Sequence, residues 1–169
     1  MIDPELAAVF VGSTIRLAAP LLLAATGELV SERAGVLNMS VEGMMLTGAF
    51  AGAVGSWATG SPSMGLLFGV LCVLPVAWLQ AFLSITLRAN QIVTGIGINI
   101  LVLGVTTLGY RALFGSRSRA EIPGLDKWAP PGLADLPVLG EHVFHQTWLL
   151  YAAAVLIVAV SWTLRATSV

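Results

Sequence analysis

Charged residues are scarce in this sequence. Asp, Glu, Lys and Arg make up 10% of its 169 residues, while 57% are hydrophobic. Ordinary soluble domains carry about 25% charged residues. A chain this short cannot hide so much apolar surface in one core. A soluble globular domain is therefore excluded, and the composition predicts an all-α integral membrane protein.

Several motifs that carry catalysis or ligand binding are also absent. Lys127 is the only lysine and no glycine-rich run precedes it, so a GxxxxGK[ST] phosphate-binding loop is excluded. Neither HExxH nor GxSxG occurs, and the single cysteine and two histidines form no metal-ligand pattern. The net charge of −1 gives no reason to expect nucleic acid. We expect no catalytic residues, no metal site and no cofactor on this chain.

Long runs without charge predict about five transmembrane helices. They are expected over residues 6–26, 44–58, 64–87, 92–113 and 147–164. In the second run, Gly48 and Gly52 form a GxxxG pair, which permits close approach by a neighbouring helix. The stretch 115–146 is the one long hydrophilic segment and is expected to form an extracytoplasmic loop.

Positive charge is unevenly divided among the connections. Arg33 and Arg88 lie in or beside two of them and Arg165 ends the last run, whereas the turn 59–63 carries no charge. The positive-inside rule therefore predicts that 28–42, 88–91 and the C-terminus face the cytoplasm. With five spans, the N-terminus is then outside.

One polar stretch interrupts the apolar sequence between the first two expected helices. Residues 27–48 read GELVSERAGVLNMSVEGMMLTG. Ionisable groups near a bilayer are costly unless they serve a purpose. On charge alone, a functional site and an ordinary cytoplasmic loop are equally good interpretations.

Two further polar residues lie inside the expected helices. Arg16 interrupts the first, where it must snorkel, face a wet cavity or pair with a carboxylate; alternatively this helix is short or interfacial. Asn99 lies in an otherwise apolar run and needs partners, which either another helix or a ligand would supply.

The polar stretch resembles the signature of permease subunits of ATP-binding-cassette importers, in the branch for nucleosides and simple sugars. That pattern is G-x-x-x-S-E-R-x-G-V-x-N-x-x-x-E-G. It is matched by Gly27, Ser31, Glu32, Arg33, Gly35, Val36, Asn38, Glu42 and Gly43. The later run ANQIVTGIGINILVLGVTTLGYR resembles the following span of the same family, through Asn90 and Asn99. The resemblance covers essentially the whole chain.

This resemblance implies a multi-pass subunit of the cytoplasmic or inner membrane that forms part of a translocation path. Its partners would be ABC ATPase subunits, a second permease subunit, an extracytoplasmic substrate-binding protein and membrane lipid. Permeases of this family are about twice as long and dock on the ATPase through a later segment. Residues 1–169 are therefore expected to be one transmembrane domain from the N-terminal part of a longer permease.

The resemblance also suggests roles for particular residues. The substrate-path candidates are Asn38, Ser40, Glu42 and Asn99. The structural or hinge candidates are Gly27, Gly35, Gly43 and Arg16. Neutral hydrogen bonds from Asn38 and Ser40 suit a sugar or nucleoside, and glycine lets the backbone turn. Arg16 and Glu42 are predicted to form a structural pair.

Three other functions stay open. A branched-chain amino acid permease would need charged or dipolar partners for the substrate's ammonium and carboxylate groups. An ion-coupled secondary transporter would need an internal repeat, and no second copy of the 27–48 pattern is found. A non-transporting remnant or scaffold is compatible with the missing ATPase-coupling segment, and predicts that the polar stretch tolerates substitution.

Overall fold

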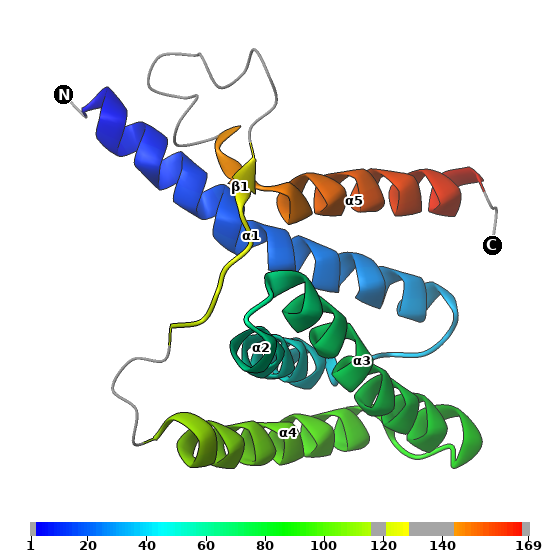
Figure 1. The fold of residues 1–169 in the computed structure, drawn as a ribbon. Helices are drawn as coiled ribbons and strands as arrows, with labels where there is room; N and C mark the ends of the chain where they lie inside the picture. Colours follow the sequence, from blue (N-terminus) through cyan, green and yellow to red (C-terminus); the bar gives the residue numbers. More distant parts are fainter. Residues whose placement is uncertain (1–2, 116–120, 129–143, 167–169) are drawn as a thin grey trace. The chain divides into compact units, whose positions relative to one another are not determined.

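The computed structural model describes residues 3–115, 121–128 and 144–166 of the chain (Figure 1). In order, its elements are α1 (Pro4–Arg33), α2 (Val41–Thr59), α3 (Pro62–Ala81), the π-helix η1 (Phe82–Thr86), α4 (Gln91–Phe114), β1 (Lys127–Trp128), β2 (Gln146–Thr147) and α5 (Trp148–Ala166). The two strands pair antiparallel, with Lys127 opposite Thr147. The loop expected over 115–146 lies largely outside the described residues.

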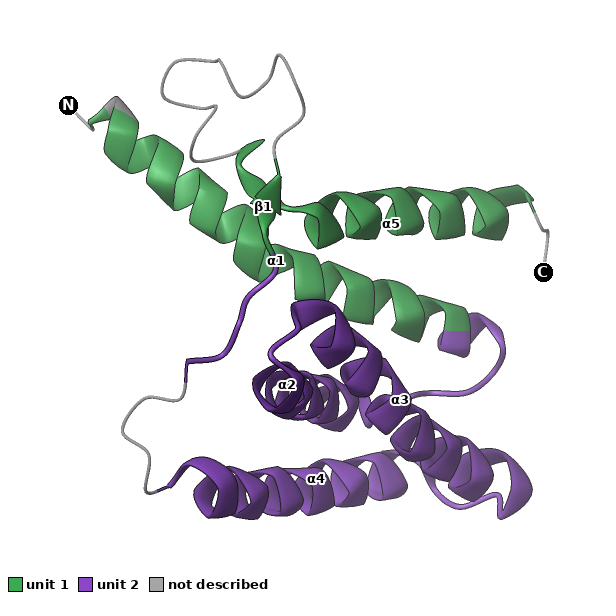
Figure 2. Cartoon of the chain, viewed as in Figure 1, with its two compact units in different colours: residues 1–30, 126–169 green, residues 31–125 purple. Residues whose placement is uncertain are grey.

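The chain divides into two compact units (Figure 2). One unit comprises residues 1–30 and 126–169, and the other comprises 31–125. In the second unit, α2 packs against both α3 and α4. In the first, the ring of Trp128 meets that of Tyr151 edge-on, with centroids 5.6 Å apart. A single transmembrane domain over 1–169 stays a prediction.

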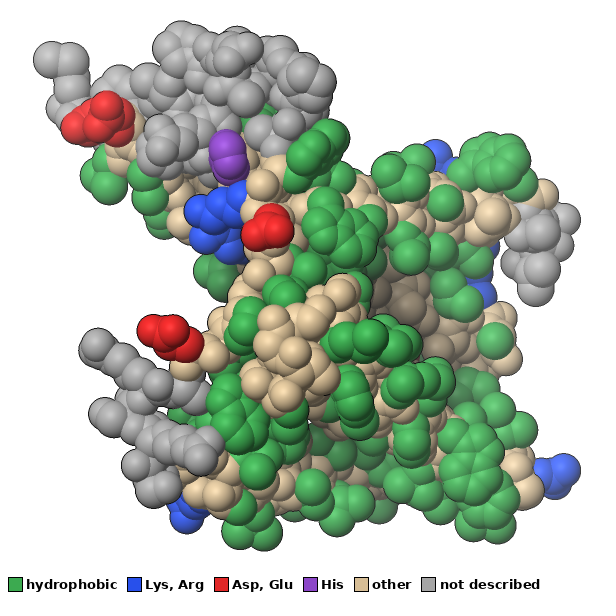
Figure 3. Space-filling view, viewed as in Figure 1, with side chains coloured by type: hydrophobic (Ala, Val, Ile, Leu, Met, Phe, Trp, Pro, Cys, Tyr) green, Lys and Arg blue, Asp and Glu red, His purple; other side chains and the backbone are tan. Residues whose placement is uncertain are grey.

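Apolar side chains lie mainly on the outside of the helices. The buried hydrophobic residues of the described part are Ala8, Ile98, Val102, Phe114 and Ala153. Many larger ones are exposed, and Figure 3 shows apolar side chains over the visible surfaces of the helices. In water this arrangement would cost about 25 cal/mol for each Å² of apolar surface. In hydrocarbon it is the expected contact, so the all-α integral membrane class is confirmed.

Four helical segments are long and apolar enough to cross a membrane. They are Glu5–Arg33, Pro62–Thr86, Gln91–Phe114 and Trp148–Ala166. These correspond to four of the five expected spans. The fifth, α2, has 19 residues and is long enough, but its many glycines make it less apolar. We therefore expect α2 to be surrounded by protein more than by lipid.

The break between α1 and α2 is shorter than the sequence predicts. The polar stretch was expected to be a glycine-broken connection from Gly27 onward, but α1 continues to Arg33. Gly35, two residues beyond the end of α1, turns the chain with a φ of +81°, a conformation that costs glycine little. The N–H of Gly35 bonds the Glu32 carbonyl at 2.9 Å, and that of Val36 bonds the Ser31 carbonyl at 3.0 Å. This pair of bonds is a Schellman motif, and only 34–40 is left between the two helices.

Small residues let α2 and α3 approach closely. A Cβ atom added to Gly69 would lie 3.0 Å from the carbonyl oxygen of Gly48. One added to Gly65 would lie 2.6 Å from the carbonyl oxygen of Gly52. The close approach predicted from the Gly48–Gly52 pair is thus confirmed, and α3 supplies a matching pair of glycines.

Candidate functional site: the loop 34–40 and its seat on α4

The loop 34–40 is stabilised first by its own side chains. Oδ1 of Asn38 accepts hydrogen bonds from the Ser40 N–H at 3.2 Å and from the Ser40 hydroxyl at 2.8 Å. An asparagine that bonds the backbone two residues on forms an Asx turn, which reverses the chain. Ser40 is fully buried. Its carbonyl accepts the Met44 N–H at 3.0 Å and so begins α2.

One face of α4 forms the seat of this loop. Gln91, Gly95 and Asn99 are four residues apart and therefore lie in a row on the helix. Oε1 of Gln91 accepts the N–H of Leu37 at 2.6 Å. At Gly95 the loop comes so close that an added Cβ would lie 2.8 Å from the carbonyl carbon of Met39. The absence of a side chain at Gly95 makes the contact possible.

Asn99 completes the seat by bonding two backbone groups at once. Its Nδ2 donates to the carbonyl of Met39 at 3.0 Å, and its Oδ1 accepts the N–H of Gly43 at 2.8 Å. The first four N–H groups of a helix have no partner within it, and Gly43 provides one of these in α2. Leaving such a group unbonded away from water costs about 1–3 kcal/mol. Asn99 therefore fixes the start of α2 against α4.

Asn90 likewise bonds backbone N–H groups, at the start of α4. Its Oδ1 accepts the N–H groups of Ile92 at 3.0 Å and Val93 at 3.3 Å, which is a standard helix N-cap. Both asparagines in the family-like run 89–111 thus bond to main-chain groups.

Three of the four substrate-path candidates lie together at the loop 34–40, and the fourth is exposed. Asn38, Ser40 and Asn99 come together at the loop, and their polar atoms bond each other and the backbone. Glu42 is exposed in the first turn of α2, where the helix dipole favours a negative charge. Contact between any of these four residues and a substrate stays a prediction.

The three glycines among the structural candidates lie in three different settings. Gly35 makes the chain reversal. Gly27 lies inside α1, and an added Cβ would meet nothing within 4 Å. Gly43 is buried, and an added Cβ would lie 2.8 Å from Oδ1 of Asn99. Its small size therefore serves close packing in the structure.

Arg16 finds a partner within its own unit. Its Nε donates to Oε1 of Gln146 at 3.2 Å, which joins α1 to β2. Glu42 belongs to the other unit, so the Arg16–Glu42 pair stays a prediction.

Two residues of the seat, Gln91 and Gly95, were not among the predicted site residues. The signal for them is their spacing to Asn99, in steps of four along one helix. Another buried pair was also missed, since Nε2 of Gln80 donates to Oγ of Ser84 at 3.2 Å where α3 widens into η1. Glutamine and serine in an apolar run do not by themselves reveal that they bond each other.

The chain is similar to permease components of ABC transporters. Residues 10–169 match the family described as "Branched-chain amino acid transport system / permease component". Over 161 residues the chain is 42% identical to the "Putative glucose ABC transporter permease protein TsgC13" of Haloferax volcanii, covering 92% of this chain and 47% of that protein. It is 33% identical over 165 residues to the guanosine ABC transporter permease protein NupQ of Bacillus subtilis, covering 94% and 52%.

A third relative is the nucleoside ABC transporter permease protein NupC of Lactococcus lactis. The two chains are 30% identical over 163 residues, which cover 91% of this chain and 50% of NupC. The chain thus spans about half the length of these curated relatives. No solved structure matches it significantly. With a family match over nearly all its residues and four helices able to cross a bilayer, the chain belongs to the family of branched-chain amino acid transport system permease components and is a multi-pass membrane protein.

Proposed function

We propose that this chain forms part of the translocation path of an ABC importer for nucleosides or simple sugars. The observation that carries the proposal is the family match over residues 10–169, in a chain whose relatives are named for glucose, guanosine and nucleosides. Because the sequence has no phosphate-binding loop, ATP hydrolysis belongs to separate ATPase subunits. A second permease subunit and an extracytoplasmic substrate-binding protein complete the proposed assembly.

The proposed orientation puts the loop 34–40 on the cytoplasmic side. The hydrogen bond from Leu37 to Gln91 brings this loop beside the start of α4, close in sequence to Arg88. Arg33 and Arg88 are both exposed near this end of the unit, which supports a cytoplasmic location under the positive-inside rule. At the other end of α2, the Ser56 hydroxyl donates to the Pro123 carbonyl at 2.7 Å. In this orientation the loop is suited to an inner gate.

A neutral substrate is supported by the lack of charge along most of α2, α3 and α4. Residues 43–87 contain no charged side chain, and neither do residues 89–110. An amino acid carries an ammonium and a carboxylate, which need charged or dipolar partners at membrane depth. The family description nevertheless names branched-chain amino acids, so leucine is the substrate that an experiment must compare.

Uptake by the assembled importer tests the proposal. The permease that contains this chain is co-expressed with its ATPase and binding protein, and uptake of labelled guanosine, glucose and leucine is measured in parallel. We expect uptake of guanosine or glucose that is lost when the phosphate-binding lysine of the ATPase is replaced. Uptake of leucine alone would assign the protein to the amino acid branch instead. An assembled complex that transports none of the three would support a scaffold.

A further inference from the structure

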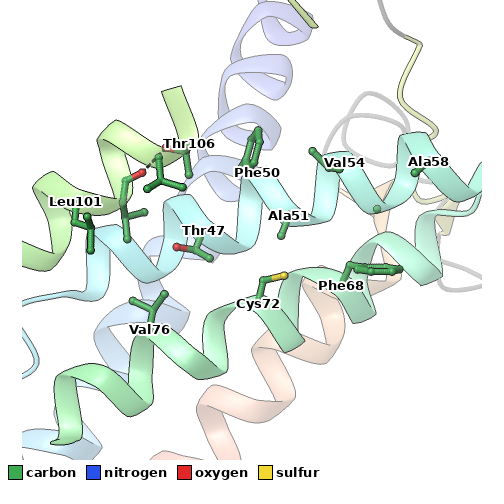
Figure 4. Close-up of a pocket in the computed structure, with 13 residues that line it drawn as sticks. Thr47, Phe50, Ala51, Val54, Ala58, Phe68, Cys72, Val76, Leu101 and Thr106 are labelled. Carbon is green, nitrogen blue, oxygen red and sulfur yellow. Dashed lines mark hydrogen bonds between the residues drawn. The ribbon is translucent and has the colours of Figure 1, made fainter. Parts of the chain in front are cut away.

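A row of apolar residues along α3 ends in a buried polar pair. Phe68, Cys72 and Val76 are four residues apart and line an apolar groove between α2, α3 and α4 (Figure 4). The next two steps of four lead to Gln80 and Ser84, which are both buried and bonded to each other. Oε1 of Gln80 nevertheless has no hydrogen-bond donor among the described residues. Such an acceptor is costly inside a membrane span, because no water is at hand.

The backbone departs from the α-helix at the same end of α3. An α-helix bonds each N–H to the carbonyl four residues earlier. After η1, the N–H of Leu87 bonds the Phe82 carbonyl at 3.1 Å, five residues earlier. The N–H of Ala89 bonds the Leu83 carbonyl at 3.0 Å, six residues earlier. Single π turns that continue an α-helix are rare and frequently mark functional sites.

Arg88 adds a strained backbone to this segment. Its φ is +51°, and no other residue except glycine has a positive φ in the described ranges. This left-handed conformation brings Cβ too close to the following carbonyl oxygen, so that mainly Gly, Asn and Asp adopt it. An unbonded acceptor, a π-helix and a left-handed arginine thus fall within residues 80–89. Strained conformations of this kind cluster at switch regions, where the surrounding structure enforces them.

A change in this segment would reach the loop 34–40. Only Ala89 and Asn90 separate Arg88 from Gln91, the first residue of α4. Oε1 of Gln91 in turn accepts the N–H of Leu37 at 2.6 Å. If η1 became α-helical, the residues after it would turn by roughly 100° about the helix axis, which is the rotation of one α-helical residue. The start of α4 and the loop that it holds would have to follow.

We propose that residues 82–90 are a hinge of the permease, in which η1 changes between a π and an α form. In the described form the hinge holds Arg88 in a left-handed conformation, and the α form releases it. Hinges of this kind are a few residues at the end of an element that absorb a change in φ and ψ. The inference rests on the proposed function, because the hinge moves the proposed inner gate. It is independent of which substrate is carried.

Deletion of Ile85 tests the hinge. A π turn holds one residue more than an α turn, so the deletion leaves an α-helical segment that cannot change form. Ile85 is 59% exposed, and its removal takes away little packing. In the assembled importer we expect uptake to fall about tenfold while the complex still assembles, because the gate no longer moves. Ile85→Ala keeps the chain length and is the matched control, with uptake close to that of the wild type. Equal uptake by the deletion variant and this control would overturn the proposal.

Thiol labelling follows the change of shape without measuring uptake. In a Cys72→Ser background, Ser84→Cys and Thr106→Cys each place one thiol at a position that is 7% exposed. A small methanethiosulfonate reagent is applied to the permease assembled with its ATPase, first without nucleotide and then with ATP and vanadate. We expect the labelling rate at position 84 to differ about fivefold between the two conditions, since local opening exposes buried groups. At position 106, on α4 outside the hinge, the rate should stay almost constant.

The labelling experiment separates failure of the hinge from failure of the proposed function. No change at position 84, or an equal change at both positions, would overturn the hinge even if the wild type transports its substrate. A wild-type complex that takes up none of the substrates contradicts the proposed function, and the labelling rates still decide the hinge. They also decide it if the deletion variant fails to assemble.

Discussion

Asn99 bonds backbone groups that lie 56 and 60 residues earlier in the chain. Hydrogen bonds between residues so far apart in sequence show which segments pack together. They matter in a membrane because a peptide group there has no water as an alternative hydrogen-bond partner. Gln91 and Asn99 both supply such bonds, and Gly95 between them supplies space. At the scale of single residues, the seat on α4 therefore depends on the side-chain amides of Gln91 and Asn99 and on the absence of a side chain at Gly95.

Asn99→Leu tests the paired bonds. The substitution keeps a similar size but leaves the Met39 carbonyl and the Gly43 N–H without partners. We expect the free energy of unfolding to fall by about 2–4 kcal/mol, as two backbone groups lose a hydrogen bond. Thermal unfolding in detergent measures the change. Thr107→Val, at an exposed position of the same helix, is the control and should leave the melting temperature almost unchanged. Equal melting of both variants would contradict the assigned role.

Gly95→Ala tests the space beneath the loop. The added methyl group would come within 2.9 Å of the Cα of Met39, so the loop must shift. We expect a loss of about 1–3 kcal/mol, the usual effect of overpacking. Gly97→Ala is the control on the same helix, because an added Cβ there meets nothing within 4 Å. Alanine favours the helix there by roughly 1 kcal/mol, so Gly97→Ala should melt no lower than the wild type. The reverse order of melting temperatures would refute the seat.

Gly35→Ala and Gly27→Ala separate the two hinge candidates. Gly35 has a φ of +81°, whereas Gly27 lies inside α1. Alanine in the left-handed conformation is strained by roughly 1–2 kcal/mol, so Gly35→Ala should lower the melting temperature. Alanine in a helix is favourable, so Gly27→Ala should raise it slightly. If Gly27→Ala were the more damaging change, the helix would have to break at Gly27 after all.

At the scale of elements, the glycine seam between α2 and α3 sets how closely these helices pack. Gly48 and Gly52 on one helix face Gly69 and Gly65 on the other. Between membrane helices there is little hydrophobic driving force, so close contact between backbones is a main source of attraction. The seam therefore joins α2, which is not among the four candidate membrane spans, to α3, which is.

Gly65→Ala tests the seam. Its methyl group would lie 2.6 Å from a backbone oxygen of Gly52 and 2.7 Å from Cβ of Ser56, and neither atom can move away easily. We expect a loss of about 2 kcal/mol, measured by thermal unfolding in detergent. Gly104→Ala on α4 is the matched control, since nothing lies within 4 Å of an added Cβ there. A seam that tolerates Gly65→Ala as well as this control would not be close-packed.

At the scale of the whole molecule, the exposed apolar surface and the short polar connections belong together. The apolar surface is directed to lipid or to further helices, and Arg33, Arg88 and Arg165 lie at or near helix ends, whereas Arg16 lies inside α1 and bonds Gln146. A charge at the bilayer centre costs several kcal/mol, so the basic ends must stay at the surface. The chain then has one side that carries Arg33 and Arg88, and another that carries the turn at residues 60–61.

Cysteine labelling in intact cells tests the orientation. In a Cys72→Ser background, Ala34→Cys and Ser63→Cys each introduce one exposed thiol, at opposite ends of α2. A membrane-impermeant maleimide should label Ser63→Cys from outside, and Ala34→Cys only after the membrane is permeabilised. The opposite pattern would invert the proposed topology and move the loop 34–40 away from the cytoplasmic side.

The sequence alone was sufficient for the class of protein and for most helices. Apolar runs of about 20 residues have one stable form in hydrocarbon, because a helix satisfies its own backbone. The sequence also located the polar stretch, but not its limits. Charges and glycines suggested a break at Gly27, whereas a glycine in a helix costs only about 1 kcal/mol and α1 continues through it.

What only the tertiary structure decided is which groups meet across the chain. Asn99 was ambiguous as helix contact or ligand contact, because an amide in an apolar run needs partners but does not name them. The structure supplies those partners from the loop 34–40 and from the first turn of α2, and adds Gln91 and Gly95 beside Asn99. Periodicity along one helix determines which residues share a face. The packing of α2 and the loop 34–40 against that face determines which backbone groups those residues bond.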